Sequence, residues 1–463
     1  MTSVLLIYPF FRRSLDRSRF RFPPLGPAYV AANLREAGHA VQLLDCSFLH
    51  REEALRQALT ADAEVVGVYC MATMTEDCQW FAERLRGHCK LLVAGGPLPT
   101  CDPGAFLEHF DVVVRGEGEQ TMRELLSAHE AGSDLAAVPG VVTRAAADAH
   151  ASGADARGSG GAGAAAPPRP FATDLDAIPF PARDLLPNEE YIRFGKQKYG
   201  FSITTVMSTR GCPYACDFCS NVVFGESYRE RSAENVVDEI EAALGLGYDR
   251  ISFADDVFTL NARRVLDICA EIDRRGLRFA WECLGRVDTF DHATALAMKQ
   301  AGCFRIFFGI ESGNDRILKL MNKQITTGQA REAVESAHRA GLEVGAFFIL
   351  CYPGETDDTV LETLRFATTL PLDYLGLTMP YPLPGTTLFD RVGDRITRDA
   401  RPDGSLLLNQ VLTFDSDFSA TKMRFAILKG QAQFRIRKRL GRLAPLALTL
   451  FAKPTDGVFR LLR

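Results

Sequence analysis

The sequence predicts an α/β protein: an N-terminal doubly wound, Rossmann-like domain, then a partial (β/α)6 barrel and a small helical C-terminal region. Three observations support this fold class. Short apolar runs alternate with amphipathic helical patterns, which is typical of βαβ units and parallel sheets. The chain has 463 residues, more than a single typical core contains. An Ala/Gly-rich stretch separates the two series of strands.

The N-terminal third is predicted to contain five buried strands with helices between them. The first run, residues 3–8, is followed by Pro-Pro-Leu-Gly at 23–26 and by a helical pattern that Gly38 ends, as glycine often does. Ligands bind at the carboxyl ends of strands in this fold, and glycines there let the backbone approach a ligand closely. The other strands are expected at 41–44, 65–69, 91–94 and 112–114, and the strand ends carry Asp45, residues 71–73, Gly95-Gly96-Pro97 and residues 115–119. These clusters predict a bulky planar or phosphate-bearing ligand.

The composition divides the chain into four segments. Residues 145–170 are rich in Ala and Gly and are expected to be a flexible linker or insertion, because they bury too little apolar surface to become ordered. The first domain is therefore predicted at 1–144, the barrel at 171–395 and a basic helical extension at 396–463. Residues 422–463 hold 11 Lys and Arg against one acid, Asp456.

The barrel segment reads as six strand-and-helix units. Functional side chains should lie just beyond the strand ends, as they do in complete barrels. Motifs occur there at 254–256, at Arg286, at 309–312 and at 352–356. The strands are expected at 203–208, 250–253, 278–283, 304–309, 343–350 and 374–378.

Three cysteines at CxxxCxxC spacing follow the first barrel strand: Cys212, Cys216 and Cys219. Iron-sulfur clusters are held by cysteine thiolates and a complete protein set is four, so three ligands leave one iron open to a substrate or cofactor. A zinc site would need a second pair of Cys or His ligands, and no His lies near Cys212 in the sequence. Most of the other nine cysteines are expected to be buried, inert thiols.

The CxxxCxxC motif with Phe218 before its last cysteine resembles the radical S-adenosylmethionine (SAM) superfamily. The resemblance implies that Cys212, Cys216 and Cys219 bind a 4Fe-4S cluster whose open iron chelates SAM, and that the reduced cluster cleaves SAM to a 5′-deoxyadenosyl radical. Phe218 is expected near the adenine. The other residues expected to contact SAM are Asp255, Asp256, Arg286, Glu311 and Ser312.

The N-terminal part resembles the cobalamin-binding domain joined to radical SAM barrels in one large subfamily, and the likeness spans about residues 3–388. It implies cobalamin binding through Thr73, Gly95, Gly96, Pro97, Gly116 and Glu117. There is no Asp-x-His-x-x-Gly segment to supply a histidine to cobalt, so the lower axial site is expected to be empty or water-filled. A dinucleotide fold is disfavoured, because no GxGxxG follows the first strand.

The resemblance implies a cobalamin-dependent methyltransferase acting on an unactivated carbon of a small-molecule, natural-product or lipid substrate, with catalytic residues unassigned. The alternatives are a cyclase or oxidoreductase on the same scaffold, an RNA-modifying methylthiotransferase, and a non-catalytic cobalamin-binding sensor. Incorporation of a methyl group into the substrate would distinguish the methyltransferase from the first alternative. Methylthiotransferases carry additional cluster cysteines, and absence of SAM cleavage would indicate the sensor.

The expected partners are a substrate and an electron donor such as flavodoxin or ferredoxin; nucleic acid is not expected at a net charge of −5. No targeting segment is evident and the thiols are free of an obvious disulfide pattern, so a cytoplasmic location is expected. The apolar run at 443–451 is too short to span a bilayer, which takes about 20 residues. The basic tail is expected to pack on the barrel, to lie on an anionic membrane or to bind an acidic partner.

Overall fold

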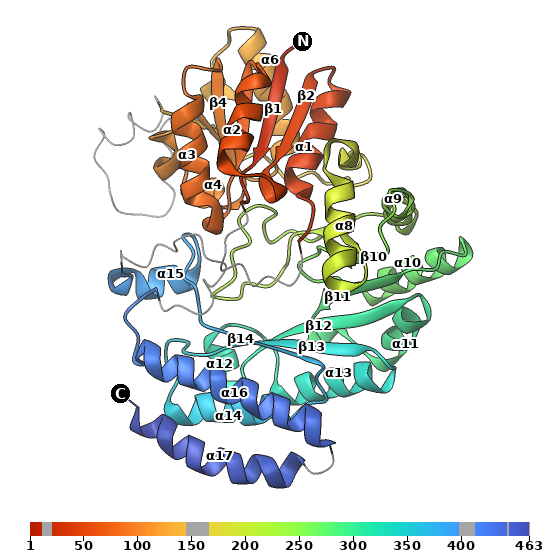
Figure 1. Ribbon diagram of the computed structural model, residues 1–463, viewed down its shortest axis with the longest axis vertical. Coiled ribbons are helices and arrows are strands. Elements are labelled where there is room, and N and C mark those ends of the chain that lie inside the picture. The colour runs from red at the N-terminus through yellow and green to blue at the C-terminus, as the bar shows by residue number, and fades with distance from the viewer. Residues whose placement is uncertain (12–20, 145–165, 398–412, 442–443, 463) are drawn as a thin grey trace.

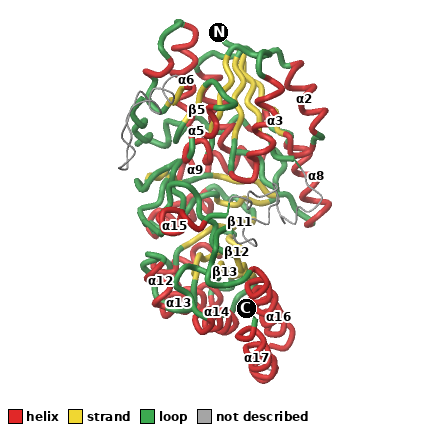
Figure 2. The backbone as a smooth tube through the Cα atoms, turned by 90° about the vertical axis from the view of Figure 1, so that its left-hand side faces the viewer, coloured by secondary structure: helices red, strands yellow, loops and turns green. Residues whose placement is uncertain are grey.

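The computed structural model describes residues 1–11, 21–144, 166–397, 413–441 and 444–462, and it contains two six-stranded sheets (Figures 1 and 2). The first sheet lies in the upper half of Figure 1 and the second below it, with loops and helix α8 (Asn188–Tyr199) between them. Residues 145–165 of the predicted linker lie outside the described part of the chain.

The first sheet has the strand order β2-β1-β3-β4-β5-β6. Strands β1 to β5 are parallel and β6 pairs antiparallel with β5. Parallel strands are covered on both faces and so consist of apolar runs, which is why all three residues of Val112–Val114 are buried. Strand β6 was not predicted. The strands are β1 (Ser3–Tyr8), β2 (Ala40–Asp45), β3 (Val65–Tyr69), β4 (Leu91–Gly95), β5 (Val112–Val114) and β6 (Val141–Thr143).

Helices cover both faces of this sheet, as the doubly wound prediction requires. One apolar core contains side chains of α1 (Leu25–Glu36) and α6 (Gly118–Glu130). The opposite core contains side chains of α2 (Arg51–Thr60), α3 (Thr75–Leu85) and α5 (Pro103–Leu107). The short helix α4 (Pro97–Cys101) follows the end of β4 directly.

The second sheet is entirely parallel, with the order β7-β10-β11-β12-β13-β14. This confirms the partial barrel of six strands. The predicted strand at 278–283 is wrong by two residues, because pairing with β10 begins only where Arg250 faces Ala280. The strands are β7 (Ile203–Val206), β10 (Arg250–Phe253), β11 (Ala280–Gly285), β12 (Cys303–Glu311), β13 (Glu343–Ile349) and β14 (Tyr374–Thr378).

The barrel helices lie on the outer face of the second sheet, where they share its main apolar core. A separate two-stranded ribbon, β8 (Thr209–Arg210) and β9 (Arg229–Glu230), closes the loop after β7 and was not predicted. The helices with side chains in this core are α9 (Ala233–Gly245), α10 (Ala262–Arg274), α11 (His292–Gln300), α12 (Asp315–Leu320), α13 (Thr327–Arg339) and α14 (Asp357–Thr369). Helix α15 (Thr387–Val392) packs in a separate apolar cluster.

The C-terminal region contains two helices, α16 (Ala420–Leu440) and α17 (Ala444–Leu461), which pack on each other and on α14. Several of their charges are paired: Lys429 Nζ lies 2.7 Å from Asp456 Oδ1, and Lys422 pairs with Asp357 at 2.8 Å. In the described part of the chain, no helix is both long and apolar enough to cross a membrane. The tail therefore packs on the barrel.

Candidate functional site

A cavity of about 520 Å³ lies between the carboxyl ends of the first sheet and the barrel. All the predicted cobalamin-binding residues except Thr73 line it. Its walls are mostly apolar and aromatic, including Tyr8, Val30 and Tyr69. The barrel contributes the opposite wall through Thr205, Met207, Arg210, Val223, Phe224 and Ala254. A large ligand in this cavity would contact both domains.

Two glycines at the end of β4 shape the cavity in different ways. Gly96 has φ +109°, and a Cβ there would lie 2.7 Å from Cys70 O, so only glycine fits. At Gly95 the nearest atom to an added Cβ is Val114 O at 3.9 Å, so the protein itself leaves room. The open space at Gly95 faces the cavity and fits the bulky ligand that the glycine cluster predicts.

Replacing Gly95 by leucine is expected to weaken cobalamin binding roughly tenfold, because overpacking typically costs about 1–3 kcal/mol. The measurement is cobalamin bound per chain, followed by absorbance across a titration. The matched control is Gly104→Leu, at an exposed glycine in α5 with no close neighbour in the protein. Equal binding by the two variants would contradict a cobalamin site in this cavity.

Buried ion pairs join the two sides of the cavity. Glu117, which precedes α6, lies 2.7 Å from Arg229 and 3.3 Å from Arg210. Arg210 also pairs with Glu119 at 2.6 Å, and its guanidinium lies 5.2 Å from the ring centroids of Tyr29 and Phe224. Burial alone lowers the pKa of Arg210, but Glu119 and Glu117 raise it overall. Glu117 thus lines the cavity and also ties the first domain to the barrel.

The three motif cysteines lie on the loop between β8 and β9. Cys212 and Cys216 are partly exposed and Cys219 is exposed. The loop begins with Gly211 at φ +82°, where a Cβ would lie 2.3 Å from Ser227 O, so the turn requires glycine. The Cys212 N–H donates to Gly225 O at 3.2 Å and the Cys219 N–H donates to Cys216 O at 3.0 Å. The loop is therefore held by its backbone while its thiols stay accessible.

The described ranges contain no preformed group of three or more His, Cys, Asp or Glu side chains that could hold a metal ion. The cluster prediction therefore depends on the cysteine spacing, because iron-sulfur clusters are held by cysteine thiolates. Burial raises the pKa of the Cys212 thiol, so metal binding would release its proton.

The predicted acidic pair divides into two roles. The Asp255 carboxylate is buried and accepts hydrogen bonds from Ser208 N at 2.6 Å and Thr209 N at 3.1 Å. Burial raises its pKa, while Arg264 and these donors act in the opposite direction. Asp255 thus anchors the chain that leads into the cysteine loop. Asp256 is exposed and interacts electrostatically with Cys212 and Cys219, so it is the member placed to reach a ligand.

Arg286 also supports the cysteine loop. Its guanidinium lies 3.4 Å from the Tyr214 ring centroid, within the motif. It donates to Asp288 at 2.9 and 3.1 Å and to Lys323 O at 2.9 Å. Arg286 is buried, and the expected contact of its guanidinium with the SAM carboxylate stays a prediction.

Glu311 and Ser312 point to different partners. Glu311 has φ +70° and its Oε1 accepts from Lys323 Nζ at 3.0 Å. Lys323 Nζ lies 5.8 Å from the Phe218 ring centroid, so this pair borders the cysteine loop. Ser312 is fully buried and its hydroxyl lies 3.1 Å from that of Thr363 on α14. Glu311 is therefore linked to Phe218 through Lys323, while the hydroxyl of Ser312 has its partner on α14.

Sequence reasoning missed two cations at this site. Lys323 follows α12 in a turn where Asn322 and Gln324 both have positive φ, and only the fold places it beside Phe218. Arg391 on α15 pairs with Asp217, between two motif cysteines. The only available signal was the polar turn after α12, because both contacts join segments far apart in the sequence.

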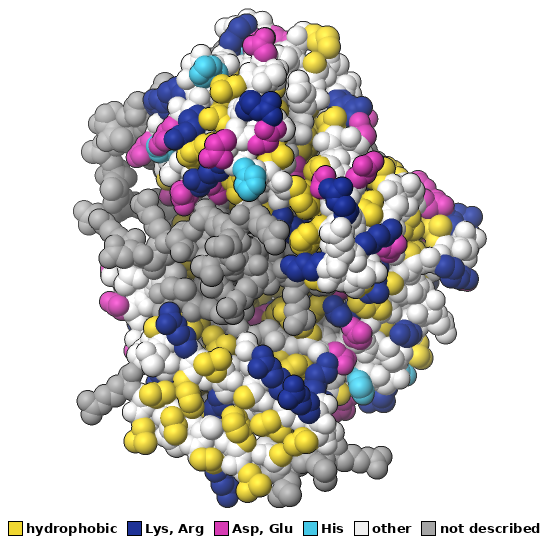
Figure 3. Space-filling view, in the orientation of Figure 1, with side chains coloured by type: hydrophobic (Ala, Val, Ile, Leu, Met, Phe, Trp, Pro, Cys, Tyr) yellow, Lys and Arg dark blue, Asp and Glu magenta, His cyan; other side chains and the backbone are white. Residues whose placement is uncertain are grey.

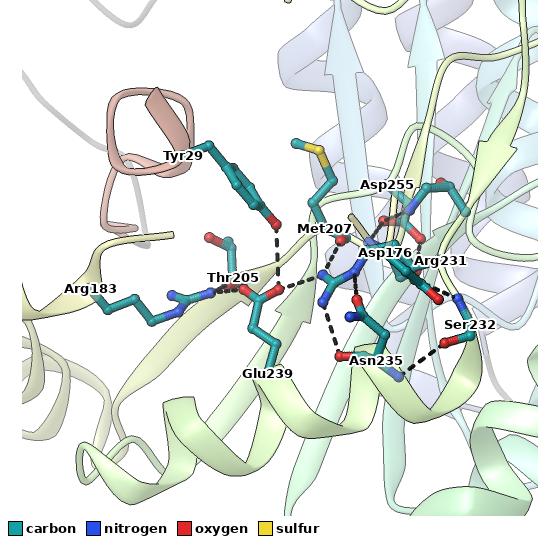
Figure 4. A network of polar contacts seen from close by, with 12 residues as sticks. Tyr29, Asp176, Arg183, Thr205, Met207, Arg231, Ser232, Asn235, Glu239 and Asp255 are labelled. Atoms are coloured by element: carbon teal, nitrogen blue, oxygen red, sulfur yellow. Dashed lines mark hydrogen bonds and ion pairs between the residues drawn. The ribbon is translucent and has the colours of Figure 1, made fainter. Parts of the chain in front are cut away.

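A buried network behind the loop centres on Glu239 of α9 (Figure 4). Its carboxylate is fully buried and accepts hydrogen bonds from both Arg183 and Arg231. The Tyr29 hydroxyl of α1 lies 3.4 Å from the same carboxylate. Arg231 in turn donates to Met207 O at 2.8 Å, just before the cysteine loop. One carboxylate therefore pairs with two buried guanidinium groups and connects both domains.

A doubly wound domain placed over a partial barrel, with a three-cysteine loop at their junction, defines the class of cobalamin-binding radical SAM proteins. The comparisons agree. A model of the "Radical SAM superfamily" matches residues 206–367 and a model of the "B12 binding domain" matches residues 15–126. The uncharacterized methyltransferase PH0819 of Pyrococcus horikoshii is 35% identical over 377 residues, covering 80% of this chain and 78% of the relative.

Two further relatives and one solved structure complete the comparison. The anaerobic magnesium-protoporphyrin IX monomethyl ester cyclase of Rubrivivax gelatinosus is 28% identical and covers 85% of this chain and 70% of the relative. The hopanoid C-3 methylase of Methylococcus capsulatus is 29% identical and covers 82% of this chain and 71% of the relative. The methyltransferase TsrM of Kitasatospora setae, solved with cobalamin and a [4Fe-4S] cluster, has the same fold, with a TM-score of 0.68 at 20% identity over 85% of this chain and 75% of TsrM.

This chain belongs to the radical SAM family whose members carry a B12-binding domain. It is therefore an enzyme, and its cofactors are a 4Fe-4S cluster, SAM and cobalamin. The cavity and the cysteine loop, described above from this chain alone, fit these groups.

Proposed function

We propose that this enzyme transfers a methyl group to an unactivated carbon of a small-molecule, natural-product or lipid substrate. One observation carries the proposal: Met207 and Arg210, which lead into the cysteine loop, also line the cavity of the B12-binding domain. The two proposed cofactor sites would therefore share a wall. When bound, the cluster supplies the electron for SAM cleavage and cobalamin carries the transferable methyl group.

The residues of the chain position these groups and exclude water. Cys212, Cys216 and Cys219 would hold the cluster, and the residues from Gly95 to Pro97 would hold cobalamin. Lys323 is a buried cation beside Phe218, so it is suited to a carboxylate of SAM, and Glu311 keeps Lys323 in place. Phe218 packs with an apolar cluster that includes Tyr352 and Leu388 and keeps water from this side.

The experiment uses anaerobically reconstituted holoenzyme with SAM and a low-potential donor such as flavodoxin or ferredoxin. A methyltransferase should release 5′-deoxyadenosine and also form S-adenosylhomocysteine in an amount that at least matches the bound cobalamin. Release of 5′-deoxyadenosine with no S-adenosylhomocysteine would instead favour a cyclase or oxidoreductase. This second candidate is kept because one relative is named as a cyclase.

Contact of the basic tail with an anionic membrane stays a prediction. Hydrophobic side chains gather over α16 and α17 in the lower part of Figure 3, with Lys and Arg among them. Leu428, Leu450 and Leu461 are 64%, 70% and 83% exposed. Co-sedimentation with phosphatidylglycerol vesicles but not with phosphatidylcholine vesicles is the expected result. Leu450→Asp should abolish it, and no sedimentation of the wild type would refute it.

A further inference from the structure

The inner face of the barrel sheet has an apolar layer formed by Leu284, Phe307, Phe347 and Tyr374. Alternate residues of these strands, such as Phe308 and Phe348, are fully buried in the core that the sheet shares with the outer helices. Side chains alternate across a strand, so Phe307 and Phe347 lie on the opposite face, which is the barrel interior. Leu284 is 40% exposed and the three rings are only partly buried. Within the described residues, this layer therefore keeps apolar surface that the protein does not bury completely.

Two glycines seat the rings flat against the sheet. A Cβ at Gly345 would lie 2.3 Å from the Phe307 ring, and a Cβ at Gly376 would lie 2.5 Å from the Phe347 ring. Each ring thus lies over the glycine of the next strand instead of projecting into the interior. The two rings are stacked, with centroids 5.5 Å apart and planes 19° apart. Tyr374 meets them edge-on at 5.6 and 6.2 Å. The result is a smooth apolar surface with an aromatic side wall.

Charged groups border this surface at both ends. Below it, towards the strand starts, Arg305 pairs with Glu343 at 2.6 Å and lies 3.5 Å from Glu282. Above it, at the strand ends, are Glu311 and Lys323 beside Phe218. Between these layers, the inward positions of the described strands β11 to β14 carry no charged side chain. A ligand that enters past Phe218 would therefore meet an apolar layer before it meets the second charged layer.

We propose that the substrate places a planar or fused-ring hydrocarbon part, aromatic or alicyclic, against Phe307, Phe347 and Tyr374. This inference depends on the proposed function, because it places the substrate in the same barrel. Flat aromatic faces favour stacked and edge-to-face partners, and such contacts contribute beyond the buried area alone. A flexible alkyl chain would lose more conformational entropy on ordering than a rigid ring of equal carbon number, so the surface favours rings.

The test measures binding of a neutral fluorescent probe, N-phenyl-1-naphthylamine, to the cobalamin- and cluster-loaded enzyme. Phe347→Ala should weaken probe binding roughly tenfold. Phe347→Leu retains apolar bulk but removes the flat ring, so it should give part of that loss. Because this variant is less disruptive to the fold, it separates loss of the ring from a folding defect. The matched control is Leu296→Ala, at an apolar residue on α11 that is 42% exposed and lies outside the proposed binding surfaces, which should leave probe affinity unchanged.

A competition experiment identifies the ligand class. Displacement of the probe by 2-decalol should need a lower concentration than displacement by 1-decanol, which has the same number of carbons. Unchanged affinity in both Phe347 variants, or equal displacement by ring and chain, would overturn the proposal. Release of 5′-deoxyadenosine without substrate is measured in parallel. Its absence in the wild type would refute the proposed function and leave the binding result to stand on its own.

Discussion

Replacing Cys216 by alanine is expected to abolish cluster assembly and, with it, SAM cleavage. Three thiolates hold the cluster in the proposed site, and the loop offers no substitute ligand, since Asp217 is already paired with Arg391. After anaerobic reconstitution, iron and sulfide per chain should fall from about four to near zero. Release of 5′-deoxyadenosine should be undetectable, and cobalamin absorbance should persist at saturating cobalamin because the cavity proposed for it does not include Cys216.

Cys89→Ala is the matched control for this experiment. Cys89 is a partly exposed thiol of the first domain whose sulfur contacts Leu85 O, away from the cysteine loop. Its replacement should leave iron content and SAM cleavage at the wild-type level. Full iron content in the Cys216 variant would remove this residue from the ligand set and with it the proposed site.

Glu239→Gln is expected to cost about 3–5 kcal/mol of unfolding free energy, because it leaves Arg183 and Arg231 buried without a countercharge. Both guanidinium groups are less than 10% exposed and Glu239 is fully buried. Urea unfolding followed by circular dichroism measures the loss. The cysteine loop should also loosen, since Arg231 holds Met207 O, and reconstituted iron should fall in parallel.

The control for the network is Glu241→Gln on the same helix. Glu241 pairs with Arg275 at 2.6 Å, but its side chain is 44% exposed, and such surface pairs contribute at most about 1 kcal/mol. If both variants were equally stable, the buried network would not hold the domains together.

The repeated strands could be predicted because apolar runs bounded by turns carry a strong signal. The expected runs at 3–8, 65–69, 250–253 and 374–378 coincide with β1, β3, β10 and β14. Short elements gave no such signal: β8 and β9 have two residues each, and β6 is an antiparallel edge of three. Their positions depend on pairing partners that a local pattern does not reveal.

The candidate site was predictable where one segment carries the chemistry. The cysteine spacing and the glycines after β4 and β5 are local patterns, and the structure places them at a common junction. The roles of Asp255 and Ser312 were not local, because Ser208 and Thr363 are their partners only in the fold. Lys323 was missed for the same reason.

The ion pairs of Glu117 have a thermodynamic consequence. Arg210 and Arg229, its two partners, flank the cysteine loop on either side, while Glu117 itself lines the cavity proposed for cobalamin. A ligand that orders Glu117 lowers the entropic cost of ordering Arg210 and Arg229 beside the cysteine loop. The same coupling acts in the opposite direction, because thermodynamic linkage is reciprocal. Cobalamin loading should therefore slow iron loss to a chelator, and removing the cluster should weaken cobalamin affinity by the same factor. Each proposed cofactor site would then be stabilised by the occupancy of the other.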